Sequence, residues 1–423
     1  MGRKTSTAKG STGTVGYKDI FRQKEYVKVI CASIVNRFGD SIDEIAFTWL
    51  VYVITGSAAW SAVVFGVNQL PSVFLQPFAG ALVEGLPKKK LLVATDLIRG
   101  VTTAGTACLY LMGSLNPWIL LAFTFLNSSA EAFRLPAGIS VVPQLLERKY
   151  YEYGTSLHAS LCSVVELIGL GASGMIISFF GIGAAIALDG ISFFASAAIL
   201  SRLDFQEHGL IGRRLPFQEY LHTLKGGFAY LRKQPIIRNL CLISVLLDAS
   251  IVPLNALQSP LIQDVLGQGS MLLGVFSFAI TAGMGVGSFA YPFLNKHCSI
   301  RTQYVGSGIL IGAGMYAYPL GASFREHVAA VYALTAINSF ILGISCSILM
   351  AALHVQFMKT VEQEYMARVG SIFNAGASAA NPVASFLISS ATSFCPVSQI
   401  FQLSALFCVI LFLALALLKV KLE

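Results

Sequence analysis

Charged residues are scarce in this sequence. Only 12% of the 423 residues are Asp, Glu, Lys or Arg, and 55% are hydrophobic, whereas an average soluble domain is about 25% charged. Together with a mean hydropathy of +0.70, this scarcity excludes a surface that faces water throughout. The sequence therefore predicts a polytopic membrane protein.

Several chemical signatures are missing as well. The cysteines are scattered, with no C-x-x-C pair and no His/Cys spacing typical of metal ligands, so neither a disulfide framework nor a metal site is expected. No GxxxxGK[ST] or enzyme motif occurs, which argues against ATP-driven transport within this chain and against an enzyme. No cofactor is expected. No cleavable signal peptide is visible at the polar, basic N-terminus.

Long apolar segments are present instead. A bilayer core of about 30 Å needs about 20 apolar residues for each helical crossing. Twelve segments qualify, which predicts an all-α polytopic membrane protein with twelve transmembrane helices in two six-helix bundles. The segments are 28–54, 58–83, 90–113, 117–145, 155–180, 182–202, 236–262, 271–293, 302–321, 326–353, 369–393 and 398–419.

The basic residues predict the orientation of these segments. Lys and Arg gather in the N-terminal tail, in alternate loops and after the last segment, whereas Arg325 lies in a loop on the other side. Positive residues stay in the cytoplasm, so both termini are predicted to be cytoplasmic in a multi-pass protein of the cell membrane. The net charge of +8 therefore indicates a lipid bilayer rather than nucleic acid as the partner, and a monomer is expected.

The longest polar stretch divides the chain into two halves. We predict an N-terminal bundle with its cytoplasmic tail at 1–202, a cytoplasmic linker at 203–235 that carries an amphipathic helix around 217–231, and a C-terminal bundle at 236–423. The ends of the fourth and tenth segments share a pattern, which indicates a weak internal repeat. Such an arrangement favours a binding site at the bilayer midplane, between halves that rock against each other.

Several stretches resemble a known family. "GALVEGLPKKK" (80–90) is similar to the loop signature of the major facilitator superfamily, with Gly80 at its start and Glu84 in place of the usual Asp. Arg134 and Gly138 resemble its second motif, and "IGLGASG" (168–174) resembles its glycine-rich antiporter motif, with Leu170 where a proline is expected. The strings "IAFTWLVYVITGSA" and "LLVATDLIRG" are similar to the branch of macrolide-efflux and siderophore-exporter transporters.

The resemblance implies a rocker-switch cycle, export and a gate on the cytoplasmic side. Glu84 would face the positive N-terminal end of the eleventh helix and pair with a basic neighbour such as Lys88. Asp96 and Arg99 are one helical turn apart near the same surface, so they join this gate or pair with each other. Glycines at 169, 171 and 174 and at 283, 285 and 287 let backbones approach closely, and the fifth and eighth helices would slide on them.

The first segment carries ionisable residues deep in the membrane. Asn36, Asp40, Asp43 and Glu44 follow i, i+4, i+7, i+8 spacing and share one helix face, and Arg37 lies within reach of Asp40. The fourth segment carries a similar set along one face: Asn127, Glu131 and Arg134. In the family, both helices line the central cavity. A charge near the bilayer centre costs about 2.5–3.5 kcal/mol and usually faces a cavity or a partner.

Two interpretations of these charges remain open. In the first interpretation, the charges form structural ion pairs, Arg37–Asp40 and Glu131–Arg134. In the second, burial and like-charge crowding favour the protonated carboxyl, so an acid exchanges protons and also binds a cationic substrate. The candidates for proton coupling are Asp40, Asp43, Glu44, Glu131 and Glu166. Asp189, nearer the outer edge of the sixth segment, is expected to be structural.

The second half is almost uncharged within the membrane. A cavity with one charged wall and one amide- or aromatic-lined wall suits a bulky amphipathic molecule. Combining both halves, we predict that substrate is bound by Asn36, Arg37, Asn127, Arg134, Asp248, Asn255, Gln258, Asn338, Phe340, Phe373 and Asn374.

These observations favour a proton-coupled exporter of amphipathic drugs or secondary metabolites, with a small molecule and protons as its partners. An exporter or flippase of one endogenous molecule, such as a siderophore or lysophospholipid, is the alternative. A ferroportin-like metal exporter is a third reading, against which the lack of a Cys/His pair at mid-depth argues. A scaffold or sensor that transports nothing would leave the acidic face without a purpose.

Overall fold

The computed structural model describes residues 17–84, 86–204, 232, 234–362 and 366–417, and this part of the chain contains helices and no strands. The predicted helix at 217–231, most of the predicted linker and the tail 1–16 lie outside the described residues. Each of the twelve predicted segments lies mainly on helical residues: two of them share one long helix, and two others are each divided among shorter helices. The fold predicted from the sequence is therefore confirmed.

The first half of the chain supplies six membrane-spanning segments. Its elements are α1 (Tyr17–Ile20), α2 (Lys24–Thr55), α3 (Ala58–Phe74), α4 (Gln76–Glu84), α5 (Lys88–Leu111), α6 (Pro117–Leu145), the short 3-10 helix η1 (Arg148–Tyr150) and α7 (Tyr151–Ser201). Helices α3 and α4 together form the second span. Helix α7 holds the fifth and sixth spans, which turn at Gly181, where φ is 82°. Glycine adopts this left-handed conformation without a steric cost.

The second half supplies six more spans. Its elements are α9 (Pro235–Ala256), α10 (Gln258–Pro260), the π-helix η2 (Leu261–Val265), α11 (Ser270–His297), α12 (Ile300–Leu320), the 3-10 helix η3 (Gly321–Phe324), α13 (Val328–Thr360), α14 (Met366–Ala391) and α15 (Val397–Leu417). The predicted seventh span, 236–262, is shorter than expected because α9 ends at Ala256, three residues after Pro253.

Five helices of the described part are long and apolar enough to cross a membrane by their own length and composition: Tyr153–Ser201, Pro235–Ala256, Ser270–His297, Val328–Thr360 and Val397–Leu417. Helix α2 is also long enough, but it carries Arg37, Asp40, Asp43 and Glu44. Because of these charges, α2 does not qualify as a span by apolar composition.

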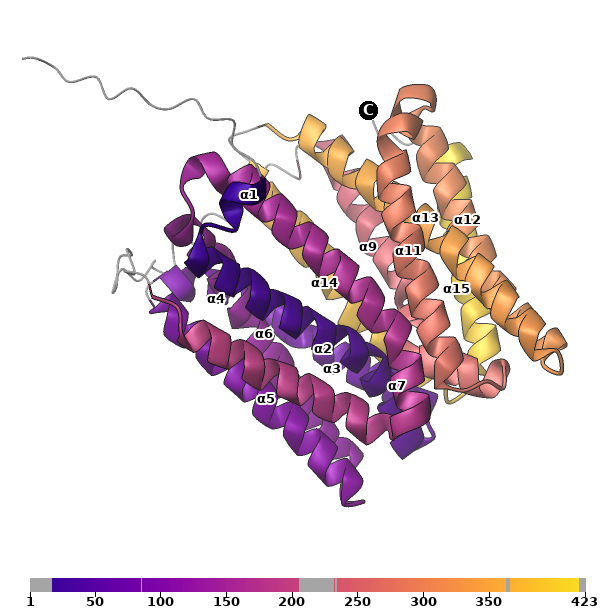
Figure 1. Ribbon diagram of the computed structural model, residues 1–423. Helices are drawn as coiled ribbons and strands as arrows, with labels where there is room; N and C mark the ends of the chain where they lie inside the picture. The colour runs from indigo at the N-terminus through magenta and orange to yellow at the C-terminus, as the bar shows by residue number, and fades with distance from the viewer. Residues whose placement is uncertain (1–16, 85, 205–231, 233, 363–365, 418–423) are drawn as a thin grey trace, which may run out of the picture.

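The two halves lie beside each other as two groups of tilted helices (Figure 1). Helix α2 begins on the side where the second part of α7 ends, because Lys28 Nζ donates to the carbonyl of Arg202 at 2.9 Å. Helix α12 begins where α15 ends, as Arg301 reaches the carbonyl of Leu415. We call this the terminal side, since α2 begins and α15 ends there, and we call the opposite side the far side.

Contacts between the halves concentrate on the far side. Helix α3 packs against α14, and α7 packs against α11. Near the far end of α2, the Tyr52 hydroxyl donates to the carboxylate of Asp264 in η2. Gly66 of α3 faces Ser385 and the carbonyl of Pro382 on α14. On the terminal side, α4 packs against α6 of its own half.

The glycines expected to form a sliding surface are divided among three interfaces. Gly174 of α7 faces the backbone of Met271 and lies against Gly274 of α11, so this pair does bring the fifth and eighth helices together across the halves. Gly169 instead faces α2. Gly283 and Gly287 face the backbone of α13 within the second half, and a Cβ added at Gly285 would meet no atom within 4 Å. Sliding between the fifth and eighth helices was therefore wrongly predicted for 169, 283 and 287, because those glycines turn toward helices of their own bundle, where they allow close packing.

Candidate functional site

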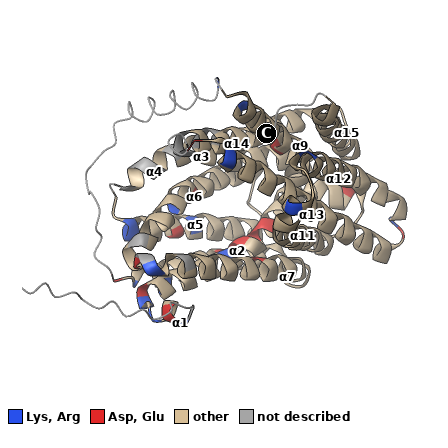
Figure 2. Ribbon diagram, turned by 90° about the horizontal axis from the view of Figure 1, so that it is seen from above, with Lys and Arg blue, Asp and Glu red and all other residues tan. Residues whose placement is uncertain are grey.

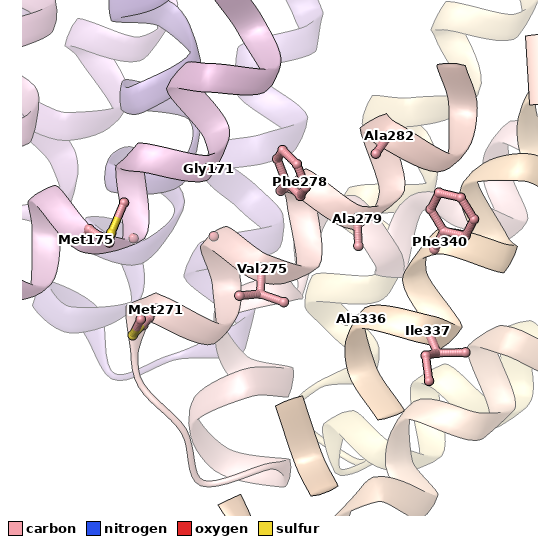
Figure 3. A pocket seen from close by; sticks show the side chains of 12 residues that line it. Gly171, Met175, Met271, Val275, Phe278, Ala279, Ala282, Ala336, Ile337 and Phe340 are labelled. Carbon is pink, nitrogen blue, oxygen red and sulfur yellow. The ribbon is translucent and has the colours of Figure 1, made fainter. Parts of the chain in front are cut away.

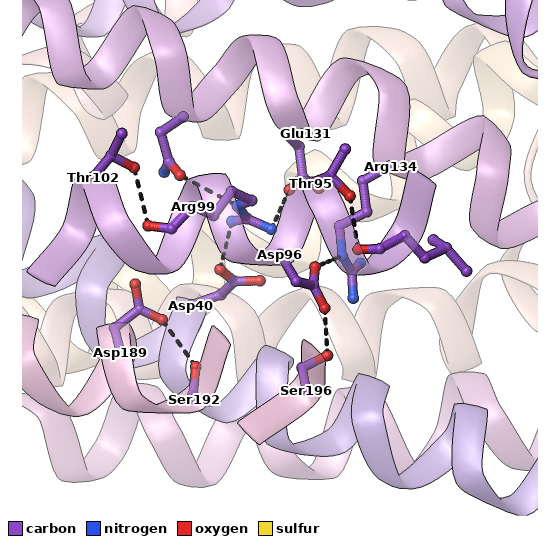
Figure 4. Close-up of polar contacts among 12 residues, drawn as sticks. Asp40, Thr95, Asp96, Arg99, Thr102, Glu131, Arg134, Asp189, Ser192 and Ser196 are labelled. Carbon is purple, nitrogen blue, oxygen red and sulfur yellow. Dashed lines mark hydrogen bonds and ion pairs between the residues drawn. The ribbon is translucent and has the colours of Figure 1, made fainter. Parts of the chain in front are cut away.

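Arg99 is the centre of a buried polar network in the first half (Figure 4). Its guanidinium donates to Asp40 of α2 at 2.8 Å and forms an ion pair with Glu131 of α6. Its Nε donates to the side-chain oxygen of Asn127 at 3.4 Å, and the ring of Phe193 lies 4.1 Å from the guanidinium carbon. One arginine thus joins four helices: α2, α5, α6 and α7.

A second arginine, Arg134, lies closer to the terminal side than Arg99 does. Arg134 of α6 forms an ion pair with Asp96 of α5, whose other oxygen accepts a hydrogen bond from Ser196 at 2.5 Å. The Asn36 amide lies between the two sets: oriented to satisfy both neighbours, it donates to Asp40 at 2.8 Å and accepts from Arg134 at 3.2 Å. The two arginine sites therefore form one continuous network.

Both predicted pairs within single helices are wrong. Asp40 and Glu131 share Arg99, whereas Arg37 contacts Glu166 of α7 at 3.8 Å. Arg134 pairs with Asp96 rather than with Glu131. The reason is geometric: side chains spaced i, i+3 share a helix face, and this face is packed against other helices that present charged groups of their own.

One of the two predicted alternatives, the pairing of Asp96 with Arg99, is wrong, because each pairs with a residue of another helix. Both lie in the interior of the first half, where Asp96 is fully buried and Arg99 is 6% exposed. Their part in a gate stays a prediction. Lys88 is also buried at the start of α5. Gly80 and Glu84 belong to α4, but their side chains lie outside the described residues.

A cavity of about 440 Å³ lies where the first half meets the second, and the acidic stretch of α2 borders it. Figure 2 shows the red acidic positions on the α2 ribbon from above. The first half contributes walls from α2, α3, α5 and α6, and the second half contributes the end of α9 and α10. We call this space the central cavity. It contains the predicted residues Asp40, Asp43, Glu44, Arg99, Asn127, Asn255 and Gln258.

Asp43 and Glu44 are the least compensated charges of this cavity. Neither forms an ion pair within the described part of the chain, and one carboxylate oxygen of Asp43 is buried without a hydrogen-bond partner there. The carboxylates of Asp40, Asp43 and Glu44 share the cavity wall with a single guanidinium, that of Arg99. The lining of the cavity therefore carries more acidic than basic side chains.

Several predicted substrate residues lie elsewhere. Phe340 lines an apolar groove of about 670 Å³ between α7, α11 and α13 (Figure 3). Asn338 donates to the carbonyl of Gly314 at 2.9 Å and so joins α13 to α12. Phe373 is 4% exposed and packs on Phe357 with ring centroids 4.8 Å apart. Asn338 and Phe373 therefore contribute to helix packing. Their residue types alone did not distinguish this role from substrate binding.

The remaining predicted residues have different surroundings. Asn374 is exposed on α14. Asp248 is half-buried on α9 and interacts electrostatically with His354 of α13.

Some residues of the site were missed by the sequence analysis. Ser61, Asn68 and Gln69 of α3 line the central cavity, and the polar pair Asn68–Gln69 inside an apolar segment was the available signal. Asp189, expected to be structural near the membrane edge, is 1% exposed and interacts electrostatically with Asp40 and Asp43. The turn at Gly181 returns α7 toward α2, so Asp189 joins the acids of the site.

A two-half helical bundle with a charged cavity between its halves defines a membrane transporter of the major facilitator type. Residues 18–349 match the family described as transmembrane secretion effector. The chain belongs to this family of the major facilitator superfamily. It is a transporter and not an enzyme, and its curated relatives are transporters as well.

Three curated proteins illustrate the relationship. Multidrug efflux pump Tap of Mycolicibacterium fortuitum is 22% identical over 84% of this chain and 86% of its own. Macrolide efflux protein A of Streptococcus pyogenes is 19% identical over 82% and 84%. The uncharacterized MFS-type transporter YkuC of Bacillus subtilis is 24% identical over 41% of this chain, and the match spans only 40% of YkuC.

Solved structures share the fold. The nucleoside transporter NupG aligns with a TM-score of 0.72 at 14% identity, covering 94% of this chain and 100% of its own. At this level of identity the likeness concerns the architecture alone.

Proposed function

We propose that this transporter exports cationic amphipathic molecules in exchange for protons, by alternating access of the central cavity to the two sides of the membrane. The observation that carries the proposal is the pair Asp43–Glu44, two carboxylates without an ion-pair partner in the described chain, in a cavity between the halves. A carboxylate in such a place binds either a proton or an organic cation. Competition between them couples the two fluxes.

The orientation belongs to this proposal. The excess of Lys and Arg puts the terminal side in the cytoplasm, with both termini inside the cell and the far side outside. Because the halves touch mainly on the far side, the conformation corresponds to an inward-facing state. Residues 1–202 and 236–423 then act as the two rocking bodies.

The chemistry of the cavity supports the substrate class. Acidic groups on α2 share the cavity with Phe47, Val51, Val64 and Phe65 and with the amides of Asn255 and Gln258. Such a lining suits a molecule with a cationic group and an apolar body. The efflux-pump relatives favour export of drug-like molecules over uptake.

Ethidium, a planar aromatic cation, is a suitable probe. We expect purified protein in proteoliposomes to move ethidium when a pH gradient is imposed. The double variant Asp43→Asn, Glu44→Gln should lose at least about tenfold of this transport, since neither amide exchanges protons or attracts a cation. The matched control is Glu147→Gln, which neutralises an exposed carboxylate on the terminal side.

Three results would reject the proposal. An ethidium transport rate that does not depend on the pH gradient would show that transport is not coupled to protons. Unchanged gradient-driven transport in both single variants and in the double variant would remove Asp43 and Glu44 from the mechanism. Equal losses in Glu147→Gln would contradict the proposal as well, because a surface carboxylate would then matter as much as the cavity acids.

A further inference from the structure

A second, smaller pocket lies directly behind Asp43, inside the first half. It measures about 50 Å³ and shares Asp43, Phe47, Asn68 and Asn127 with the central cavity. Its remaining polar lining consists of four threonines: Thr102, Thr103, Thr106 and Thr124. We call it the threonine pocket. Asp43 therefore stands between two spaces, one facing the second half and one enclosed by the first.

The threonine hydroxyls have a defined polarity. Thr102 shares its hydrogen between the carbonyls of Ile98 and Arg99 at 3.0 and 2.9 Å, Thr106 donates to the carbonyl of Thr102 at 2.9 Å, and Thr124 donates to the carbonyl of Leu120 at 2.7 Å. A hydroxyl has a single hydrogen, so these three oxygens present only lone pairs to the pocket. The three oxygens therefore suit an occupant that donates hydrogen bonds, such as water.

Asp43 adds a stronger acceptor to the same wall. Its Oδ1 is buried and has no hydrogen-bond partner among the described residues. An unsatisfied buried acceptor is destabilising, and more so when it is charged. One water molecule needs roughly 10–15 Å³ of space and two to four polar partners. The pocket has room for a few water molecules and the acceptors to hold them.

We propose that the threonine pocket is a hydrated proton-transfer chamber that delivers protons to Asp43 from the far side, while substrate uses the central cavity. This proposal rests on the proposed function. A protonated water in the chamber gives its proton to Asp43 Oδ1, which leaves neutral water and a neutral carboxyl. On the terminal side, Asp43 returns the proton to water in the open cavity and regains its negative charge.

The position of the pocket fixes the direction of this path. Along α5, Thr102 and Thr106 lead from Arg99 toward Leu111, the end of that helix on the far side. Along α6, Asn127 and Thr124 lead back toward Pro117, where α6 begins on the far side. The chamber thus extends from Asp43 in the direction opposite to the terminal side.

The charged groups around Asp43 are compatible with this role. Asp40 and Glu44 lie on its own helix and Arg99 on α5, and Asp189 faces it from α7. Helix α3 contributes Asn68 to the pocket, and this side chain is uncharged. Three neighbouring carboxylates and one guanidinium surround the group, so a proton arriving at Asp43 lowers the local repulsion.

The test removes the acceptors and keeps the shape. We expect the double variant Thr102→Val, Thr106→Val to lose at least about fivefold of ethidium transport driven by a pH gradient, while ethidium binding measured by fluorescence stays within about twofold of the parent, because substrate does not enter this pocket. Thr106→Ser keeps the oxygen and should keep parental transport. The matched control is Thr95→Val: Thr95 is similarly buried on α5 and donates to Leu91 at 3.0 Å, but it does not line the pocket.

The outcomes separate this proposal from the proposed function. Parental gradient-driven transport in the double valine variant would overturn the chamber and leave proton exchange at Asp43 intact. An equal loss in Thr95→Val would overturn it too, because any buried threonine would then have the same effect. Failure of the parent to respond to a pH gradient would instead reject the proposed function itself, and the chamber with it. Loss of ethidium binding in the double variant would identify the threonines as substrate contacts and overturn the chamber.

Discussion

At the scale of single residues, the first half is held together by charges buried between its helices. Asp96 is fully buried and satisfies Arg134 and Ser196 at once, and Arg99 serves two carboxylates. Breaking a buried ion pair by removing one partner costs about 3–5 kcal/mol, because the other charge stays buried alone. These residues are therefore expected to determine stability as much as transport.

The variant Asp96→Asn tests this expectation. We expect it to lower the free energy of unfolding by about 3 kcal/mol or more, measured by denaturant unfolding of the purified protein in detergent. Glu147→Gln is the control, since Glu147 pairs with Lys149 at 2.7 Å but is 69% exposed, and an exposed pair contributes at most about 1 kcal/mol. Similar stabilities of the two variants would show that the Asp96–Arg134 pair is not structural.

At the scale of helices, α11 and α13 approach each other backbone to backbone. A methyl group on Gly283 would collide with the carbonyl of Phe340, and one on Gly343 would collide with the carbonyl of Ile280. Small residues allow such close packing where the hydrophobic effect gives no driving force between helices in lipid. This pair forms a rigid unit within the second half.

A matched pair of substitutions on α11 tests this packing. Gly283→Ala should destabilise the protein by about 1–3 kcal/mol, since the helices must move apart. Gly285→Ala should be neutral or slightly stabilising, because no atom lies within 4 Å of the added methyl and alanine favours a helix over glycine by roughly 1 kcal/mol. Thermal unfolding of both variants in one detergent gives the comparison. A larger loss for Gly285→Ala would contradict the packing.

At the scale of the whole molecule, the far side is closed by a contact between the halves. Tyr52 of α2 donates to Asp264, and Asp264 is held in place by Arg325, which donates to its carbonyl at 2.9 Å. Gly267, with φ of 66°, lies against the Arg325 guanidinium. The hydrogen bond therefore joins α2 to an anchored segment of the second half.

Removing the Tyr52 hydroxyl should weaken this closure. We expect Tyr52→Phe to shift the population toward the state open on the far side, seen as faster hydrogen–deuterium exchange in α10 and η2, residues 258–265, and slower exchange at the terminal-side ends of the helices. Tyr316→Phe, on an exposed tyrosine of α12, is the control. Unchanged exchange in Tyr52→Phe would show that apolar packing alone closes this side.

The architecture could be predicted from the sequence for a physical reason. Spans are recognisable by their apolar length. The break in α7 lies at Gly181, and α9 ends three residues after Pro253, so both follow from residues that interrupt helices. The acidic face of α2 was also predictable, since Asp40, Asp43 and Glu44 interrupt an apolar run and follow helical spacing. All three line the central cavity.

The partners of these charges were not predictable from one helix at a time. Arg99 and Asp96 are close in sequence, but each pairs with a residue on another helix. The second-half candidates Asn338 and Phe373 were predicted from their residue types. The orientation of each helix about its own axis directs them toward other residues of the second half, where they pack. Rotation about a helix axis depends on tertiary packing, and a span that is apolar all round carries little signal of it.

The pairing of Asp40 with Arg99 also has a consequence for biogenesis. The two residues are 59 positions apart, so the ribosome completes the first acidic helix well before its counter-charge exists. Each unneutralised acid costs about 2.5–3.5 kcal/mol at mid-bilayer, which disfavours release of that helix into lipid by itself. Insertion is therefore favoured when the first helix stays beside the translocation machinery until the arginine-bearing third span arrives.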